Sequence, residues 1–88
     1  MIDKTAIINP KAKIHKNVRI GPYTVIGPNV EIGENTIIQS HVNISGHTKI
    51  GNNVQIGGGS GVIRDIPDNS KVMGYPSKDL RKFLKENK

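Results

Sequence analysis

The sequence contains no cysteine and no tryptophan, and its aromatic side chains are limited to one phenylalanine and two tyrosines. Without cysteine the chain can form neither disulfides nor thiolate metal sites, and its redox compartment stays open. So few aromatic rings leave almost no surface for stacking bases, so we expect no nucleic-acid partner. No apolar run approaches the ~20 residues that span a bilayer, and the N-terminus lacks a signal-peptide pattern. We therefore expect a cytoplasmic protein with no membrane span.

The chain also has little length from which to build a core. A domain of 88 residues buries only about 60 to 65% of the surface that its unfolded chain exposes, so its stability margin is small. Because disulfides and thiolate metal sites are excluded, association with other copies is the remaining source of stability. We expect a homo-oligomer.

Positive charge is present but unevenly distributed. The formal net charge is +6, yet residues 20–48 contain no lysine or arginine. The basic residues gather near the two ends of the chain, as Lys11, Lys13, Lys16 and Arg19, and as Lys78, Arg81, Lys82, Lys85 and Lys88. This distribution indicates solvated basic ends that keep the protein soluble, with acidic partners as the alternative.

The dominant pattern is a repeat of six residues. An aliphatic residue recurs without insertion at Ile2, Ile8, Ile14, Ile20, Ile26, Ile32, Ile38, Ile44, Ile50, Ile56 and Val62. Four positions after each comes a small or β-branched residue, from Ala6 to Ile66, and the register is unbroken through Pro67. Glycine often follows the aliphatic position, where we expect a corner to need backbone freedom or a positive φ. A period of six fits neither a helix nor ordinary hairpins, so it predicts a parallel β-solenoid.

The aliphatic-Gly-x-x-small-x hexad resembles that of the hexapeptide-repeat acyltransferases. The resemblance implies a left-handed parallel β-helix with three hexads per coil, although general crossover rules favour the opposite hand. Residues 18 apart should then stack, in inner columns that begin at Ile2, Ile8 and Ile14. The third column would next meet Asp68, which cannot lie unpaired in an apolar core. We therefore expect an all-β solenoid over 1–67, just under four coils, followed by a closing turn over 68–76.

Outside the core register, two neighbouring columns predict a subunit contact. Ile7 and Val25 are 18 residues apart and share the first column. Thr5, Tyr23 and His41 share the second column at the same spacing. An apolar strip beside a polar one on the same face is typical of an interface, whereas scattered surface apolar residues are the alternative. We expect these five residues to hold a homotrimer together.

The hydrophobic periodicity changes in the last residues of the chain. After Pro76, Ser77 can cap a helix, and Leu80, Phe83 and Leu84 recur at helical spacing. The sequence therefore predicts a short C-terminal helix over 77–88, within a single domain, that docks on the β-helix or on a neighbouring subunit.

Two parts of the chain resemble two different members of the acyltransferase family. Residues 1–57 resemble the N-terminal coils of UDP-N-acetylglucosamine O-acyltransferase of lipid A biosynthesis, through Met1-Ile2-Asp3-Lys4, Ile20 to Gly33 and Ser40 to Gly51. Residues 58–88 resemble the closing coil and tail of the related UDP-3-O-acyl-glucosamine N-acyltransferase, through Gly59 to Val62, Asp65 to Pro67 and Val72 to Pro76. Because those enzymes are far longer, the resemblance implies a truncated or engineered chimera.

Catalysis by this chain is not expected from that resemblance. Acyl transfer to a sugar hydroxyl needs a general base, and the family supplies a histidine at the third position of a hexad. Here His15 is second in its hexad, and His41 and His47 are fourth. His41 is a weak candidate because it lies near the predicted subunit contact. The histidines share no spacing, so we expect no metal site, and we expect no cofactor.

Three hypotheses follow. The first is a trimeric scaffold without catalysis of its own. The second is a small acyltransferase that moves an acyl group from acyl carrier protein or acyl-CoA to a UDP-sugar at the subunit interface. The third is a binding module for acyl chains, nucleotide-sugars or anionic surfaces, with its ligand-binding residues unknown.

Overall fold

The computed structural model describes residues 1–74 and 78–79, and within them the chain is built from very short strands. These described residues contain no helix, and therefore none that could cross a membrane. The strands are β1 (Ile7–Ile8), β2 (Lys13–Ile14), β3 (Arg19–Ile20), β4 (Val25–Ile26), β5 (Glu31–Ile32), β6 (Ile37–Ile38), β7 (Asn43–Ile44), β8 (Lys49–Ile50), β9 (Gln55–Ile56), β10 (Gly61–Val62), β11 (Lys71–Met73) and β12 (Lys78–Asp79).

The strands form three sheets, and each strand from β1 to β11 pairs in parallel with equivalents in the neighbouring coils. In the first sheet, Ile7 faces Val25 and Ile8 faces Ile26, so equivalent residues are 18 apart. The same offset joins β2 to β5 and β3 to β6. The predicted parallel solenoid with three hexads per coil is therefore confirmed.

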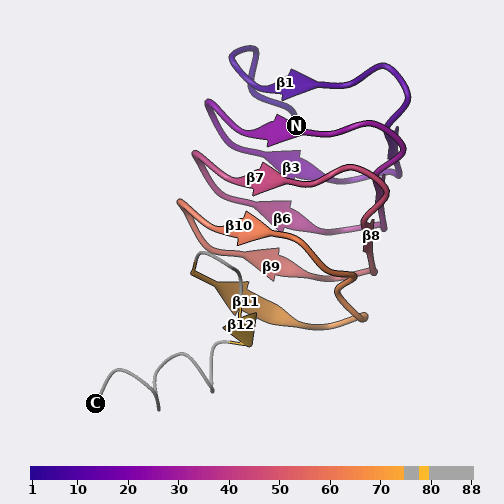
Figure 1. Ribbon diagram of the computed structural model, residues 1–88, viewed down its shortest axis with the longest axis vertical. Coiled ribbons are helices and arrows are strands. Elements are labelled where there is room, and N and C mark those ends of the chain that lie inside the picture. Colours follow the sequence, from indigo (N-terminus) through magenta and orange to yellow (C-terminus); the bar gives the residue numbers. More distant parts are fainter. Residues whose placement is uncertain (75–77, 80–88) are drawn as a thin grey trace.

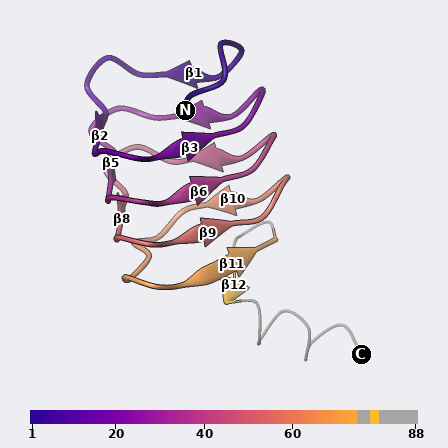
Figure 2. The same ribbon diagram turned by 180° about the vertical axis from the view of Figure 1, so that it is seen from behind.

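The direction of winding follows from the ribbon. In Figure 1 the nearer strands β7 and β10 run from left to right, and the farther strands β6 and β9 run back from right to left. The chain descends as it turns, and Figure 2 shows the same path from behind. The coil is left-handed, as the family resemblance implies and against the usual crossover preference.

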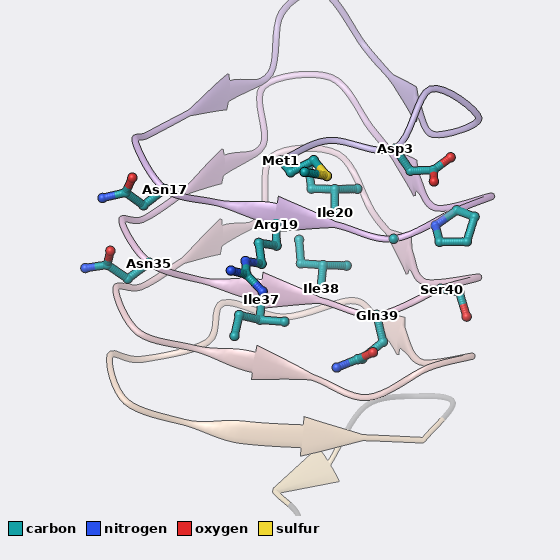
Figure 3. Close-up of a pocket in the computed structure, with 12 residues that line it drawn as sticks. Met1, Asp3, Asn17, Arg19, Ile20, Asn35, Ile37, Ile38, Gln39 and Ser40 are labelled. Carbon is teal, nitrogen blue, oxygen red and sulfur yellow. The ribbon is translucent and has the colours of Figure 1, made fainter.

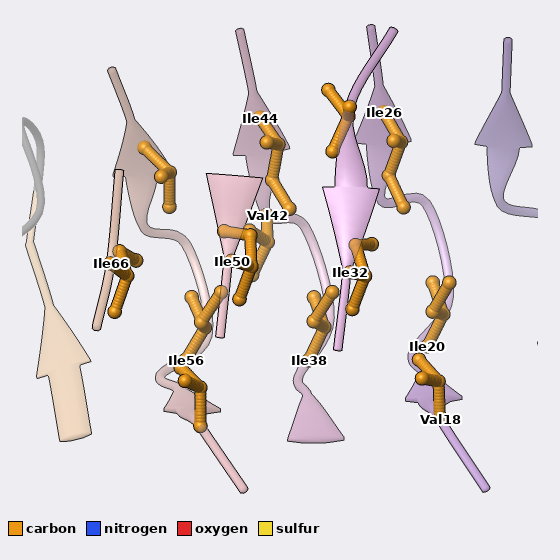
Figure 4. Packing of buried hydrophobic residues seen from close by; sticks show 13 residues of the cluster. Val18, Ile20, Ile26, Ile32, Ile38, Val42, Ile44, Ile50, Ile56 and Ile66 are labelled. Carbon is orange, nitrogen blue, oxygen red and sulfur yellow. The ribbon is translucent and has the colours of Figure 1, made fainter. Parts of the chain in front are cut away.

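The core is a column of stacked aliphatic side chains (Figure 4). Every second strand residue points inward, because successive side chains of a strand alternate between its faces. Ile20, Ile38 and Ile56 form one row and are at most 2% exposed. The β-branched residues predicted to fit beside the large ones, including Val18, Val30, Val42 and Val54, are buried as well.

Two buried threonines of that second set, Thr24 and Thr36, form side-chain hydrogen bonds. Thr24 donates its hydroxyl to the carbonyl of Gln39 at 2.9 Å and accepts from the amide of Val42 at 3.2 Å. Thr36 makes the same two bonds two hexads further along the chain, to the carbonyl of Gly51 and from the amide of Val54. Within the described residues no buried side-chain polar atom lacks a partner, so these hydroxyls join successive coils without a desolvation penalty.

The corners use a different residue for positive φ than the sequence suggested. The glycines after the aliphatic position do not adopt it; the residue two places later does, as at Asn17, Asn35 and Asn53. The glycine is required for space instead. A Cβ at Gly21 would lie 2.7 Å from the backbone of Gln39 in the next coil. Asparagine tolerates the left-handed region better than most residues, so it suits these corners.

The register predicted through Pro67 is wrong in the last coil. After Val62 the chain shortens by two residues, so that Ile66 pairs with Ile50 and Val72 pairs with Ile56. Ile66 thus occupies the large aliphatic row, 6% exposed, where the unbroken register placed Asp68. Asp68 lies outside, where its carboxylate accepts the amide of Asn52 at 2.8 Å.

Parallel stacking therefore continues past the predicted boundary at Pro67 and into β11, part of the region expected as a closing turn. The predicted helix over 77–88 lies almost entirely outside the described residues. Its two described residues, Lys78 and Asp79, are not helical; they form β12, antiparallel to β11. This pairing covers the free edge of the last coil, which explains why a strand is favoured there.

Candidate functional site

Each coil presents its outward residues in three columns, one for each sheet. On the β1-β4-β7-β10 sheet the outward column is Ile7, Val25, Asn43 and Gly61. On the β2-β5-β8 sheet it is charged, with Lys13, Glu31 and Lys49. On the remaining sheet it is mixed, with Arg19, Ile37, Gln55 and Lys71. The apolar column is thus confined to the first coils of one face.

The five predicted interface residues lie together along one edge of the prism, which we call the corner strip: Thr5, Ile7, Tyr23, Val25 and His41. Ile7 is 65% exposed and Tyr23 61%, both large for apolar or aromatic side chains. The rings of Tyr23 and His41 stack with centroids 5.2 Å apart and planes tilted by 36°. The structure brings all five residues together, while their role in assembly stays a prediction.

Hydrogen bonds fix the top of the corner strip. The amide of Tyr23 donates to the hydroxyl of Thr5 at 3.0 Å. That hydroxyl donates in turn to a carboxylate oxygen of Asp3 at 2.6 Å, which also accepts the amide of Thr5 at 2.9 Å. The side-chain bond from Thr5, and then its backbone bond, lower the pKa of Asp3 from its ordinary value of 3.8. A carboxylate therefore holds the corner from which Tyr23 projects.

The backbone of the corner strip is unusual. Tyr23 has φ of 59° and His41 has φ of 57°, in the left-handed region. Histidine occurs there more often than most residues, but a bulky tyrosine is uncommon. The corresponding corners between β2 and β3, and between β5 and β6, use Asn17 and Asn35. The fold accommodates asparagine at such a corner, so tyrosine in the same conformation adds backbone strain here.

A second feature is an open groove over β3 and β6 (Figure 3). Arg19 and Ile37 project from its floor, Asn17 and Asn35 stand along one edge, and Gln39 and Ser40 along the other. Among the described residues Arg19 forms no ion pair, because the single pair there joins two other side chains. Considering residues 1–74 and 78–79, the groove therefore offers the guanidinium of Arg19, without an ion-pair partner, beside apolar surface, which suits an anionic group attached to an apolar chain.

That single ion pair joins His15 to Glu31 on the charged sheet. His15 Nε2 lies 3.0 Å from a carboxylate oxygen of Glu31, and both side chains are partly exposed, 38% and 43%. The hydrogen bond from His15 is the main cause that lowers the pKa of Glu31, with Lys13 and Lys49 adding smaller electrostatic effects. A carboxylate-oriented imidazole can transfer protons, but solvated pairs of this kind are common on surfaces.

Sequence reasoning found the corner strip but missed both the groove and this ion pair. Glu31 lies opposite Lys13 in the parallel register, and His15 is two residues further on, so the contact is a diagonal one. The 18-residue stacking already contained that signal, because diagonal neighbours come within reach of long side chains. The groove had no comparable signal, since its edges are formed by turn residues.

The three histidines lie on different parts of the β-helix. His41 is on the corner strip, His15 on the charged sheet, and His47 at the corner between β7 and β8. In the part of the chain that the structure describes, no three His, Asp or Glu residues are grouped as they would be around a metal ion.

The sequence matches one protein family. The model described as "Bacterial transferase hexapeptide (six repeats)" matches residues 11–46 and 29–64, which together span more than half of the chain. No curated protein matches the chain.

Solved structures share the fold. A serine acetyltransferase of Neisseria gonorrhoeae superposes with a TM-score of 0.85 at 28% identity, over 91% of this chain and 35% of that one. A serine acetyltransferase in complex with CoA gives a TM-score of 0.85 at 22% identity, over 91% and 36%. PerB from Caulobacter crescentus, in complex with CoA and GDP-perosamine, gives 0.61 at 20% identity, over 89% and 55%. The chain thus spans about a third of the length of the two serine acetyltransferases.

Proposed function

This chain belongs to the bacterial transferase hexapeptide family, and we propose that it acts as a self-assembling trimeric β-helix of the acyltransferase type. The observation that carries this proposal is the corner strip. Ile7, Val25 and Tyr23 expose apolar and aromatic surface in consecutive coils, on one edge of a prism whose other outward columns are charged or mixed. Exposed apolar surface gathered in this way marks a contact site.

The shape of the corner strip suits a threefold axis. Its residues repeat coil by coil along one straight edge, so three parallel prisms can bring the same edge to a common axis. A short chain with a narrow core gains stability from burying that surface. The strained tyrosine corner fits this role, because its ring gains packing in an assembly that it lacks in a single chain.

The test places charge on the corner strip. In the variant Tyr23→Lys with Val25→Lys, we expect the trimer to dissociate, as measured by light scattering. The matched control is Asn35→Lys with Ile37→Lys, which changes the same two hexad positions on another face. An unchanged mass in the first variant, or equal dissociation in both, would contradict the assignment.

Acyl transfer at the subunit contact is the second candidate function. It is supported by the family match and by the likeness to acetyltransferase structures whose titles name CoA. In this proposal His41 acts as the general base, and the groove with Arg19 receives the anionic part of an acyl carrier or acyl-CoA. The ring of Tyr23 would hold the imidazole of His41 in place from one side.

Substitution by asparagine tests that role without straining the corner, because His41 and His47 both have positive φ. With acyl thioester and UDP-sugar as substrates, His41→Asn should abolish turnover, and His47→Asn, at a different corner, should preserve it. Turnover that is absent in the unmodified chain, or retained in His41→Asn, would remove this candidate and leave the scaffold.

The finer assignments rest on the sequence resemblance. We propose a cytoplasmic location and a relation to the lipid A acyltransferases, as a truncated or joined form of two of them. The remaining interpretation of the groove is that it binds acyl chains or nucleotide-sugars without catalysis. Calorimetric titration of the chain with acyl carrier protein and with UDP-sugar tests it, because a scaffold alone would give no heat of binding.

A further inference from the structure

The outward face of the β2-β5-β8 sheet carries charges that alternate in sign from coil to coil. Lys13 pairs in register with Glu31, and Glu31 with Lys49. Asp65 takes the next position, and its carboxylate accepts the amide of Lys49 at 2.9 Å. We call these four residues the charge column: Lys13, Glu31, Lys49 and Asp65. Its two lysines balance its two carboxylates, although the whole chain carries a net charge of +6.

The two cations of the charge column have no ion-pair partner in the described part of the chain. The single ion pair found there joins Glu31 to His15 and includes neither lysine. Lys13, Lys49 and Asp65 are all exposed. Stacking in one chain therefore brings the alternating charges into one row without joining the lysines to carboxylates, so their ammonium groups can pair with a second molecule.

The charge column is complementary to itself when its direction is reversed. If two copies face each other in antiparallel orientation, Lys13 of each lies opposite Asp65 of the other, and Glu31 lies opposite Lys49. The match holds along the whole column, because both copies have the same coil spacing of about 4.8 Å. Parallel copies would place like charges opposite each other, which is repulsive. The order of the charges therefore favours the antiparallel arrangement alone.

The same face is low beside the charge column and lies away from the corner strip. Two residues after Glu31 and Lys49 come Gly33 and Gly51, which have no side chains to keep a second face at a distance. Tyr23 lies between β3 and β4, so the corner strip lies between the other two sheets. In Figure 2, β2, β5 and β8 stack along the left edge, away from that corner. Assembly through the corner strip therefore leaves the charge column exposed.

We propose that this face binds a second copy of the chain, antiparallel to the first, through the charge column. Opposite charges at matched spacing identify the partner, because a self-complementary patch forms the same contacts from both sides of a twofold axis. Exposed ion pairs contribute little each, so the contact is weak and requires a high chain concentration. At about 0.15 M salt, charges more than about 8 Å apart are screened, so the net charge of the chains opposes the contact only slightly. Neither the trimer nor catalysis is needed, since single chains and trimers present the same face.

Zero-length coupling with a carbodiimide tests the contact, because it joins an ammonium to a carboxylate only where the two groups touch. Within one chain Lys13 and Asp65 are three coils, roughly 14 Å, apart, which is too far for a direct bond. A parallel trimer does not bring them together either, since equivalent residues then lie at the same height. We expect mass spectrometry of the digested protein to find a Lys13–Asp65 cross-link that is lost at about 1 M salt. Absence of this link at high chain concentration would overturn the proposal.

Charge reversal then tests the order of the charges. Glu31→Lys and Lys49→Glu each place like charges opposite each other twice in the pair of copies, so each variant alone should lose roughly tenfold or more in cross-link yield. An equal mixture of the two variants restores opposite charges at every position and should recover the yield. Lys71→Glu is the matched control for Lys49→Glu, because it reverses an exposed lysine on another sheet, and it should leave the yield unchanged.

Circular dichroism checks that every variant keeps the fold of the unmodified chain. No recovery in the mixture, or equal losses in Lys49→Glu and Lys71→Glu, would contradict pairing through the charge column. The mass of the unmodified chain at low concentration reports the trimer separately, so failure of one contact is distinguishable from failure of the other.

Discussion

Replacing Ile38 by alanine should destabilise the β-helix by about 3 to 5 kcal/mol, whereas the same change at the neighbouring Ile37 should cost about 1 kcal/mol or less. The two residues are adjacent in β6 and of the same type, but Ile38 is 1% exposed and Ile37 projects into the groove. Comparing the two substitutions therefore separates the effect of packing in the core from the effect of the local sequence.

The magnitude follows from the surroundings of Ile38. Its side chain lies between Ile20 and Ile56 in one inner row, and parallel pairing on both sides fixes the spacing of these coils. The row cannot close over the missing atoms, so the cavity remains and the cost lies in the upper part of the range for such substitutions. Against a typical total stability of about 5 to 15 kcal/mol, this is a large fraction.

Urea denaturation followed by circular dichroism measures both variants at one matched chain concentration, because association would make stability depend on concentration. The expected result is a much lower midpoint for Ile38→Ala and a nearly unchanged one for Ile37→Ala. Equal midpoints, or a larger loss at Ile37, would refute the register on which every assignment of faces depends.

Three further predictions concern the corners and the corner strip. Asn35→Gly should leave the melting temperature nearly unchanged, whereas Asn35→Ala should lower it, because φ of 62° strains alanine; equal effects would contradict the corner geometry. The lowered pKa of Asp3 means that its stabilising effect is complete above its ordinary value of 3.8 and is lost as the pH falls through the lower folded value. Asp3→Asn should therefore melt with a weaker pH dependence below pH 3.8 than the unmodified chain. Val25→Cys, in a chain with no native cysteine, should form disulfide-linked dimers on oxidation, and a matched Ile37→Cys should not; equal yields would argue against the corner strip as the contact.

Much of this fold could be predicted from the sequence because the six-residue repeat determines the coil. A period of six with small residues at fixed places determines which isoleucines point inward, and the pairing of Ile20 with Ile38 follows directly. The shortened last coil could not be predicted from that period alone, because Ile66 fits the small row of the old register as well as the large row of the new one. The later six-residue step from Ile66 to Val72 was the available signal.

The corner strip could be predicted from stacking, and the diagonal contact of His15 with Glu31 could have been, whereas the groove could not. Tyr23 and His41 are 18 apart, so their contact follows from the coil length. Their positive φ did not follow, since glycine seemed the natural residue for it; the glycines are needed where the next coil passes close by.

Three copies of the chain are expected to associate through the edge on which Ile7, Tyr23 and Val25 lie. Sedimentation equilibrium of the unmodified chain tests it most directly, over a wide range of concentrations. We predict a mass three times that of the 9.6 kDa chain. A species of 9.6 kDa at every concentration would contradict the account.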